Sequence, residues 1–248
     1  MNVMLTGYGR MGREIESILT KRGHSVTCKI DKGGFGDYTE VSLDLLKKVD
    51  VVIEFALPEG MECRIKLYTE SKVPVIMGNT GWLDKLEDFK KIVLEGDGSF
   101  LYGTNFSIGV HMFWNIVSNA SRLINSSPEY DIMMLEYHHN KKKDSPSGTA
   151  ITTAEKIISN CHAKTDIWTD KLDREILPNE LHVASVRGGY IPGTHSVTLD
   201  SPADTIEINH IARNRSGFAM GAVMAAEWMI GKKGFFTVED FFNNLMEK

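Results

Sequence analysis

The run of residues 136–150, EYHHNKKKDSPSGTA, gathers the side chains in this sequence that could do chemistry. His138 and His139 end an apolar stretch, and three lysines follow directly after Asn140. Histidine titrates near neutral pH and lysine is a compact cation, so this run could move protons and hold an anion. Taken singly, each of these residue types is more often structural or exposed. Their convergence within fifteen residues is what indicates a functional site.

The end of the same run predicts a second feature, an anion site. A helix that opens at Ser147 or Gly148 leaves its first backbone N–H groups without intrahelical partners. Together with the positive end of the helix dipole, these donors would hold a carboxylate or a phosphate. The alternative reading of Ser-Gly-Thr before a helix is ordinary capping. The run therefore offers proton carriers, positive charge and an anion cradle in one loop.

Two other kinds of site are poorly supported by the residue patterns. Adjacent histidines on a strand point to opposite faces, and no nearby cysteine or H-E-x-x-H motif supports a metal centre at His138 and His139. There is no G-x-S-x-G motif, and Ser147 resembles a helix cap more than a nucleophile. His182, His195 and His210 lie on predicted strands, where we interpret them as core or interface histidines.

Composition excludes several classes of protein. The chain of 248 residues has 42% hydrophobic and 25% charged residues, which is ordinary for one large globular domain or two joined ones. A net charge of -5 argues against a nucleic-acid partner. No stretch is apolar enough for a membrane span, and no secretory signal is visible, so we expect a cytoplasmic protein without a membrane partner. Three widely spaced cysteines do not indicate a disulfide framework or a zinc site.

The N-terminus carries a dinucleotide-binding pattern in its required context. An apolar strand at residues 2–6 is followed by G-x-G-x-x-G and then by a helix at residues 10–21. A second strand ends at Asp31, an acidic residue that could take the ribose hydroxyls of a bound dinucleotide. The residues of the glycine loop are the first candidates for cofactor binding: Gly7, Tyr8, Gly9, Arg10, Met11 and Gly12.

Strands and helices continue to alternate to about residue 106, which predicts a doubly wound parallel sheet of the Rossmann type. Pro58 is expected to start one of these helices. In such sheets ligands bind beyond the carboxyl ends of the strands. The residues that fall at such ends are further cofactor candidates: Phe55, Gly78, Asn79, Thr80, Gly103, Thr104, Asn105 and Phe106.

The second half of the chain predicts a different layout, an inserted α+β domain. Residues 181–187, 195–199 and 205–211 alternate as half-buried strands do, which predicts a second and mainly antiparallel sheet. The helices expected at 217–230 and 237–246 should pack back on the first domain. We therefore expect residues 1–106 with 214–248 to bind a dinucleotide. Residues 107–213 are expected to form a substrate-binding and oligomerisation domain. The pattern does not place residues 160–179.

At this point the residues resemble a known family. The run at 136–150 matches E-x-H-H-x-x-K-x-D-x-P-S-G-T-A, the signature of the 4-hydroxy-tetrahydrodipicolinate (dihydrodipicolinate) reductases of the lysine pathway, at every fixed position. The resemblance extends to GYGRMG at 7–12, NFSIGV at 105–110, SVRGGYIPGTH at 185–195, HIARNR at 210–215 and FAMGA at 218–222. It covers nearly the whole chain.

The resemblance implies an NAD(P)H-dependent reduction that yields tetrahydrodipicolinate, in a homotetramer assembled through the sheet of the second domain. By position, His138 is implied to be the acid–base histidine and Lys142 the proton donor, while His139, Gly148 and Thr149 fall on substrate-binding positions. The glycine loop, Asp31 and the strand-end residues named above fall on cofactor positions. A dicarboxylate needs two anion sites, and His139 with Arg215 are the candidates to complete them.

Three departures from the family pattern bear on the cofactor. The glycine loop is one residue shorter than the commoner form, Lys32 stands where many members have arginine, and Leu57 occupies a position that is arginine in some members. We expect dual use of NADH and NADPH with a modest preference for NADH. The alternatives are another two-domain nicotinamide dehydrogenase and a dinucleotide-sensing regulator without turnover. The intact H-H-x-x-K loop argues against a sensor, which needs no proton donor.

Overall fold

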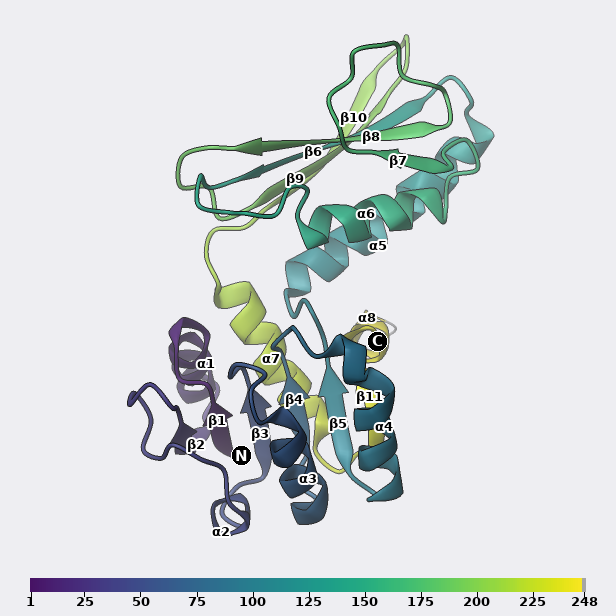
Figure 1. Ribbon diagram of the computed structural model, residues 1–248. Helices are drawn as coiled ribbons and strands as arrows, with labels where there is room; N and C mark the ends of the chain where they lie inside the picture. Colours follow the sequence, from purple (N-terminus) through teal and green to yellow (C-terminus); the bar gives the residue numbers. More distant parts are fainter. Residues whose placement is uncertain (247–248) are drawn as a thin grey trace. The chain divides into compact units, whose positions relative to one another are not determined.

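The computed structural model describes residues 1–246, which form two compact units (Figure 1). The first unit contains Met1–Ile108 and Arg215–Lys248, and the second contains Gly109–Asn214. Each unit has its own sheet; the first unit has two buried apolar clusters and the second has one. Within residues 1–246, no helix has the length and apolar character needed to cross a membrane.

The first unit is built on a parallel sheet of six strands in the order β11-β5-β4-β3-β1-β2. Its strands are β1 (Asn2–Thr6), β2 (Ser25–Ile30), β3 (Val51–Glu54), β4 (Val75–Met77), β5 (Ser99–Tyr102) and β11 (Gly234–Thr237). Five of them are predicted from the sequence. The four residues of β11 lie between two helices and are too few to show a period of two, so sequence analysis misses this strand.

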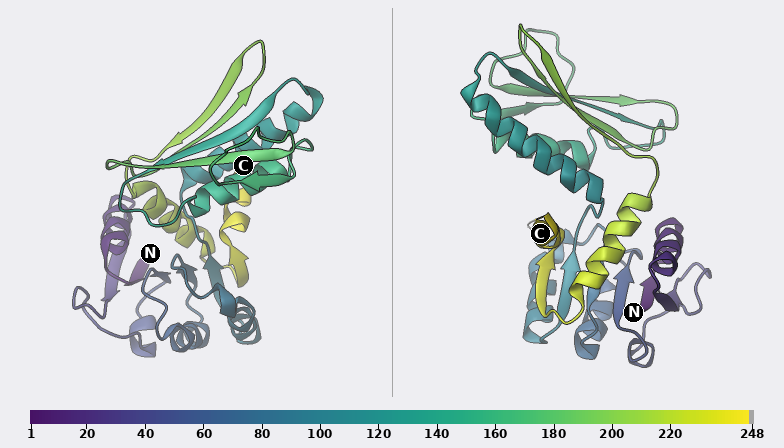
Figure 2. Two further views of the ribbon diagram at one scale, coloured as in Figure 1. Left: turned by 45° about the horizontal axis from the view of Figure 1, so that its top comes forward. Right: turned by 180° about the vertical axis from the view of Figure 1, so that it is seen from behind.

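Helices cover both faces of this sheet, which explains why the strands read as continuous apolar runs. One buried cluster joins the sheet to three helices, α1 (Arg10–Lys21), α7 (Ser216–Met229) and α8 (Val238–Met246). A second cluster joins the other face to α2 (Leu43–Leu46), α3 (Met61–Ser71) and α4 (Leu86–Glu95), the last preceded by the 3₁₀ turn η1 (Leu83–Lys85). The view from behind in Figure 2 shows α7 lying across the sheet. The fold is therefore doubly wound, as the alternation predicts.

The expectation that Pro58 starts a helix is wrong. Helix α3 begins at Met61, after Gly60 in a left-handed conformation. The loop before it is held by Arg64, whose Nη2 donates to the Leu57 carbonyl at 2.9 Å. The same guanidinium forms an ion pair with the fully buried Glu54, at 3.1 Å between Nε and Oε2. This tertiary ion pair fixes the loop in a turn that local propensity does not show.

The second unit has a five-stranded sheet in the order β10-β9-β6-β8-β7. Its strands are β6 (Asp131–His138), β7 (Asp166–Trp168), β8 (Glu180–Arg187), β9 (Thr194–Asp200) and β10 (Thr205–Ile211). Helices α5 (Ile108–Leu123) and α6 (Gly148–Ile158) pack side by side on one face of the sheet, and the 3₁₀ turn η2 (Ile124–Ser126) follows α5 (Figures 1 and 2). Trp114 of α5 donates to Thr153 of α6 across their contact, at 2.9 Å.

This sheet is mixed, so the expectation of a mainly antiparallel sheet is wrong. Strands β10, β9 and β6 pair antiparallel, whereas β6, β8 and β7 pair parallel. The parallel half arises because α6 and the unassigned region 160–179, which contains β7, form a crossover between β6 and β8. Alternation along one strand reports which face is buried but not the direction of its neighbours, so the pattern could not reveal this.

The loops after β1 and β3 touch at the point where the strand order reverses. Strand β2 lies on one side of β1 and β3 on the other, which makes the β1/β3 carboxyl ends the switch point of the sheet. Gly7 has a φ of 88°, and a Cβ atom there would lie 2.4 Å from the Ala56 backbone nitrogen. Only glycine fits this approach.

We therefore predict that Gly7→Ala lowers the free energy of unfolding by roughly 1–3 kcal/mol, because the added methyl meets backbone in a conformation that alanine rarely adopts. Gly9→Ala is the matched control, since nothing lies within 4 Å of a Cβ at that position. Urea unfolding of both variants measures the difference. Equal stability of the two variants would show that the β1/β3 contact is not as tight as this structure has it.

Candidate active site

In the first unit, the predicted cofactor loops line the carboxyl edge of the sheet. The glycine loop leads from β1 into α1, and a Cβ at Gly12 would lie 2.5 Å from the Gly7 carbonyl oxygen. This close packing of loop on helix lets the N-terminus of α1 face a bound pyrophosphate. Tyr8 and Met11 are half-buried, whereas Gly9 and Arg10 are exposed. The geometry fits a dinucleotide.

Asp31 is tied to the glycine loop. One carboxylate oxygen accepts from the Tyr8 amide at 2.8 Å, and the other accepts from the Gly33 amide at 2.8 Å. The carboxylate is therefore held in place at the end of β2, with lone pairs remaining on both oxygens for ribose hydroxyls. Lys32 is exposed beside it. This placement agrees with the role expected for Asp31 in the fingerprint.

The loops after β3, β4 and β5 complete this edge. The Phe55 ring lies against Gly78, where a Cβ would come within 2.1 Å of the ring. Asn79 donates to the Ala56 carbonyl at 2.5 Å, and its own Oδ1 is buried without a hydrogen-bond partner among the described residues. An orphaned acceptor in this crevice suits an amide donor such as that of a nicotinamide. Of the remaining candidates, Thr80 and Thr104 are exposed, whereas Gly103, Asn105 and Phe106 are buried.

In the second unit, the reactive residues surround a buried carboxylate, that of Glu136. Glu136 is 0% exposed, on the face of β6 that also carries the core residues Ile132 and Met134. It accepts from the Ser147 amide at 2.9 Å and from the Ser147 hydroxyl. Donors from strand β8 reach it as well, Ser185 Oγ at 2.9 Å and Arg187 Nη2 at 2.7 Å. One side chain thus joins β6, β8 and the start of α6.

Two histidines flank the same carboxylate. His138 Nδ1 lies 3.2 Å from Glu136 Oε2, and His195 Nε2 lies 3.5 Å from that oxygen and 3.2 Å from the Ser147 hydroxyl. The two imidazole rings stand edge to face, with centroids 5.2 Å apart. Burial raises the pKa of Glu136, but the hydrogen bonds from His195, Ser147 and Arg187 outweigh it and hold that pKa well below its ordinary value. The carboxylate is therefore ionised.

His138 is a neutral imidazole at physiological pH. Its side chain is 9% exposed, and burial lowers its pKa to about 4 against the opposing effect of Glu136. The charges of His195, Lys142 and Arg187 contribute to the same lowering. On the other edge of the ring, a Cβ at Gly193 would lie 2.9 Å from His138 Nε2, so glycine at this position keeps the approach to that nitrogen open.

The loop between β6 and α6 presents Lys142. Its ammonium is 2.9 Å from Asp144 Oδ2, and this hydrogen bond lowers the pKa of the Asp144 carboxyl. The loop itself is fixed by backbone bonds, from the His139 amide to Ile191 and from the Lys142 amide to His139. His139 is half-buried, with its Nδ1 unpaired among the described residues.

Helix α6 begins at Gly148, as the sequence predicts. Ser147 is its N-cap, and the Ser147 hydroxyl accepts from the Ala150 amide at 3.2 Å. Gly148 is exposed and nothing lies within 4 Å of a Cβ at that position, so a ligand could approach the first turn closely. Arg215, the remaining substrate candidate, precedes α7 in the first unit and is exposed.

Sequence analysis missed the residues that support this site. In the sequence, Glu136 stands out only as part of a motif, and the positions of Ser185, Arg187 and Asp144 do not by themselves indicate a role. His195 is buried, as a core histidine should be, but it contacts Glu136. The available signal was parity: Ser185 and Arg187 pair with Glu136 and His138 in the β6–β8 register and alternate on one face. The sequence alone does not show that β8 pairs with β6, so this alternation could not be connected with Glu136.

Three donor atoms of Glu136, His138 and His195 lie within 4.8 Å of one another, which is also the spacing of a metal site. The Glu136 carboxylate already accepts hydrogen bonds from the Arg187 guanidinium and from the Ser147 amide and hydroxyl. A guanidinium at 2.7 Å would repel a metal cation at the same carboxylate. The cluster is better suited to holding and moving protons than to binding a metal.

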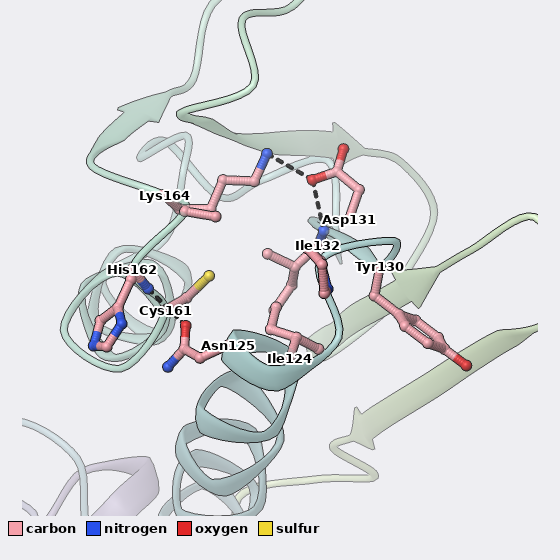
Figure 3. A pocket seen from close by; sticks show the side chains of 10 residues that line it. Ile124, Asn125, Tyr130, Asp131, Ile132, Cys161, His162 and Lys164 are labelled. Atoms are coloured by element: carbon pink, nitrogen blue, oxygen red, sulfur yellow. Dashed lines mark hydrogen bonds and ion pairs between the residues drawn. The ribbon is translucent and has the colours of Figure 1, made fainter.

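A cavity of about 170 Å³ lies at the opposite end of β6 (Figure 3). Lys164 is 3% exposed beside it, and its ammonium donates to the carbonyls of Pro178 and Glu180 and pairs with Asp131 at 2.6 Å. These three partners use all the donors of the ammonium. Lys164 therefore ties the crossover to the sheet, and the cavity is smaller than ordinary ligand pockets.

Comparisons with known proteins cover both units. A family model described as dihydrodipicolinate reductase, N-terminus, matches residues 1–106, and its C-terminus counterpart matches residues 109–242. The chain belongs to the dihydrodipicolinate reductase family. A 4-hydroxy-tetrahydrodipicolinate reductase of Christiangramia forsetii is 38% identical over the full length of both chains. One from Archaeoglobus fulgidus is 34% identical and covers 97% of this chain and 99% of its own.

Solved structures agree on the fold. A dipicolinate-bound dihydrodipicolinate reductase from Paenisporosarcina sp. TG-14 aligns with a TM-score of 0.76 at 19% identity, over 97% of this chain and 98% of its own. A probable dehydrogenase from Thermotoga maritima aligns with a TM-score of 0.55 at 9% identity, over 99% of this chain and 94% of its own. Family membership makes the chain an oxidoreductase, the reductase of lysine and diaminopimelate biosynthesis, with a fold that binds pyridine nucleotides.

The depressed pKa of His138 predicts a pH dependence of stability. Between its unfolded pKa of about 6.5 and its folded pKa of about 4, the unfolded chain binds a proton that the folded chain does not, so acid favours unfolding. From pH 7 to pH 4.5, the wild type should lose about 2–3 kcal/mol of unfolding free energy relative to His138→Gln. Urea unfolding of both proteins across this range measures the difference. Parallel pH curves would contradict a buried neutral His138.

Proposed function

We propose that this protein reduces 4-hydroxy-tetrahydrodipicolinate to tetrahydrodipicolinate with a reduced nicotinamide cofactor, binding the dinucleotide on residues 1–106 with 214–248 and the substrate on residues 107–213. The observation that carries the proposal is the cluster around Glu136. It places a neutral imidazole, a serine-capped helix N-terminus and the loop of Lys142 around one buried carboxylate. The balanced reaction consumes one hydride and one proton and releases water.

The substrate is a dicarboxylate, and the second unit offers a place for one of its carboxylates. The amides of Gly148 and Thr149 belong to the first turn of α6, where backbone donors have no partner four residues earlier. The helix dipole adds to their attraction for an anion. His139 of the same unit is the group we assign to the other carboxylate. The Paenisporosarcina relative, which shares the fold, was solved with dipicolinate, a planar dicarboxylate.

Lys142 and His138 divide the proton chemistry in this proposal. The cofactor supplies the hydride when it is bound, and the conjugated imine that accepts it gains negative charge. Lys142, held by Asp144 at 2.9 Å, stabilises that charge and donates the proton. His138 is neutral at physiological pH, so its imidazole can accept a proton from the substrate.

The assembly that we propose is a homotetramer formed through the uncovered face of the second sheet. Helices α5 and α6 cover one face, and the other presents Met133, Leu135, Tyr137 and Val186 in neighbouring positions of β6 and β8. Met133 is 42% and Val186 45% exposed, which is costly for a sheet face in a monomer. Sedimentation velocity should give the mass of four chains, and a monomer at micromolar concentration would contradict the proposal.

The proposed activity is tested by following oxidation of NADH and NADPH at 340 nm with freshly prepared substrate. We expect turnover that depends on 4-hydroxy-tetrahydrodipicolinate and is inhibited by dipicolinate. Turnover only with an amino acid or a sugar would favour another two-domain dehydrogenase. Cofactor binding without turnover of any of these would favour a dinucleotide sensor.

In that assay Lys142→Ala should lower kcat by about 10²–10⁴-fold, the usual contribution of a positioned proton donor. Cofactor affinity should change little, because Lys142 lies in the second unit. Lys141→Ala and Lys143→Ala are matched controls on exposed neighbours in the same loop. Comparable losses in all three variants would mean that positive charge in the loop is sufficient, and the assignment of Lys142 would fail.

For the cofactor we propose dual use with a modest NADH preference. Asp31 should repel the 2′-phosphate of NADPH, while Lys32 attracts it with a single point charge. Asp31→Asn keeps an acceptor for the Tyr8 amide and should shift the ratio of kcat/KM toward NADPH. Lys32→Ala should lower kcat/KM for NADPH more than for NADH. A wild type strongly selective for NADPH would show that Lys32 outweighs Asp31.

A further inference from the structure

Glu136 contacts both His138 and Ser147, the residue that caps α6. On one side Glu136 Oε2 faces His138 Nδ1 at 3.2 Å. On the other side its oxygens accept hydrogen bonds from the amide and the hydroxyl of Ser147, the residue that caps α6. Because the Ser147 hydroxyl donates its hydrogen to Glu136, its oxygen is oriented to accept from the Ala150 amide. That accepted hydrogen bond is the N-cap of α6. The base and the anion cradle are thus fixed by one group.

Charge determines which nitrogen of His138 carries the proton. A carboxylate only accepts hydrogen bonds, so the His138 tautomer with hydrogen on Nδ1 is attracted to Glu136, and the tautomer with a bare Nδ1 is repelled. The two atoms are close enough for this effect, although the ring is not aligned for a full hydrogen bond. Arg187 Nη2 at 2.7 Å supports the ionised form of Glu136. The consequence is a bare Nε2, at the edge of the ring that Gly193 leaves open.

We propose that Glu136 is a positioning residue for this reaction. It holds His138 in the Nδ1–H tautomer, so that Nε2 can accept a proton, and it anchors the N-terminus of α6 for the substrate carboxylate. The inference rests on the proposed function, in which His138 accepts a proton and the N-terminus of α6 binds a substrate carboxylate. Other charged or titratable groups around the His138 ring are His195 of β9, Arg187 of β8 and Lys142 of the loop that follows β6. None of these reaches both His138 Nδ1 and the Ser147 amide.

The first test is the tautomer itself, measured in the full-length wild-type protein without substrate. Long-range ¹H–¹⁵N correlation spectra at pH 7 distinguish a protonated from a bare ring nitrogen, and His138→Gln assigns the signal. We expect His138 with hydrogen on Nδ1 and a bare Nε2. A wild-type protein with hydrogen on Nε2 would overturn the proposal without any variant at Glu136.

The second test separates the effect of the Glu136 charge from the effect of its side-chain length. Glu136→Gln adds two donor hydrogens where only acceptors fit, so the Nδ1–H preference should be lost and kcat should fall on the order of 10²-fold. Glu136→Asp keeps the charge but is one methylene shorter, so it should keep the tautomer and raise KM through the loosened Ser147. Ser185→Ala is the control that removes a neutral donor to the same carboxylate at 2.9 Å. It should leave the tautomer unchanged.

Urea unfolding followed by circular dichroism reports whether the second unit of each variant is folded, and NADH affinity, followed by fluorescence, reports the same for the first unit. An unchanged tautomer with kcat within about twofold of wild type in Glu136→Gln would overturn the proposal. Failure of the proposed function gives a different result, in which His138→Gln retains full kcat. That outcome would remove the catalytic role of His138 while leaving the tautomer measurement to decide what Glu136 does.

Discussion

The interaction on which the second unit depends is the burial of one ionised carboxylate, Glu136, under five neighbouring polar groups. An unpaired charge in such a place would destabilise the fold by several kcal/mol. It is tolerated because Arg187 balances the charge and Ser147 and Ser185 donate to its oxygens. Ser185 and Arg187 come from β8, and Ser147 comes from the start of α6. Satisfying this one group therefore brings β6, β8 and the start of α6 to a common point.

The same arrangement keeps His138 neutral, which our proposal that it accepts a proton requires. His138 is buried and neutral, with Lys142 and Arg187 nearby and Glu136 opposing their effect. Lys142 is kept apart by its pair with Asp144, which holds the ammonium in the loop. The proposed proton donor, Lys142, and the proposed proton acceptor, His138, thus stay distinct although they are four residues apart in the sequence. In the first unit the corresponding constraint is steric, because Gly7, Gly12 and Gly78 each leave room for neighbouring backbone or for the Phe55 ring.

Much of this could be predicted from the sequence because the signals are local. The glycine loop, Asp31 and the capped helix at Ser147 all follow from residue types within one supersecondary unit, and the structure places each as expected. The expectations that failed depend on contacts between separate secondary-structure elements. The loop at Pro58 is set by the Arg64–Glu54 ion pair, and the mixed sheet is set by a crossover whose only strand has three residues. The partners of Glu136 are separated from it by up to 59 residues, His195 being the farthest, so no local pattern identifies them.

The central claim is that Glu136 and His138 act as one unit in proton transfer, and a double-mutant cycle on kcat tests it most directly. Glu136→Gln, His138→Gln and the double variant are compared with wild type at saturating substrate and cofactor. Residues that act through one another give strongly non-additive effects. The account predicts that Glu136→Gln lowers kcat markedly in the wild-type background and hardly at all in the His138→Gln background. Full multiplication of the two losses in the double variant would contradict it.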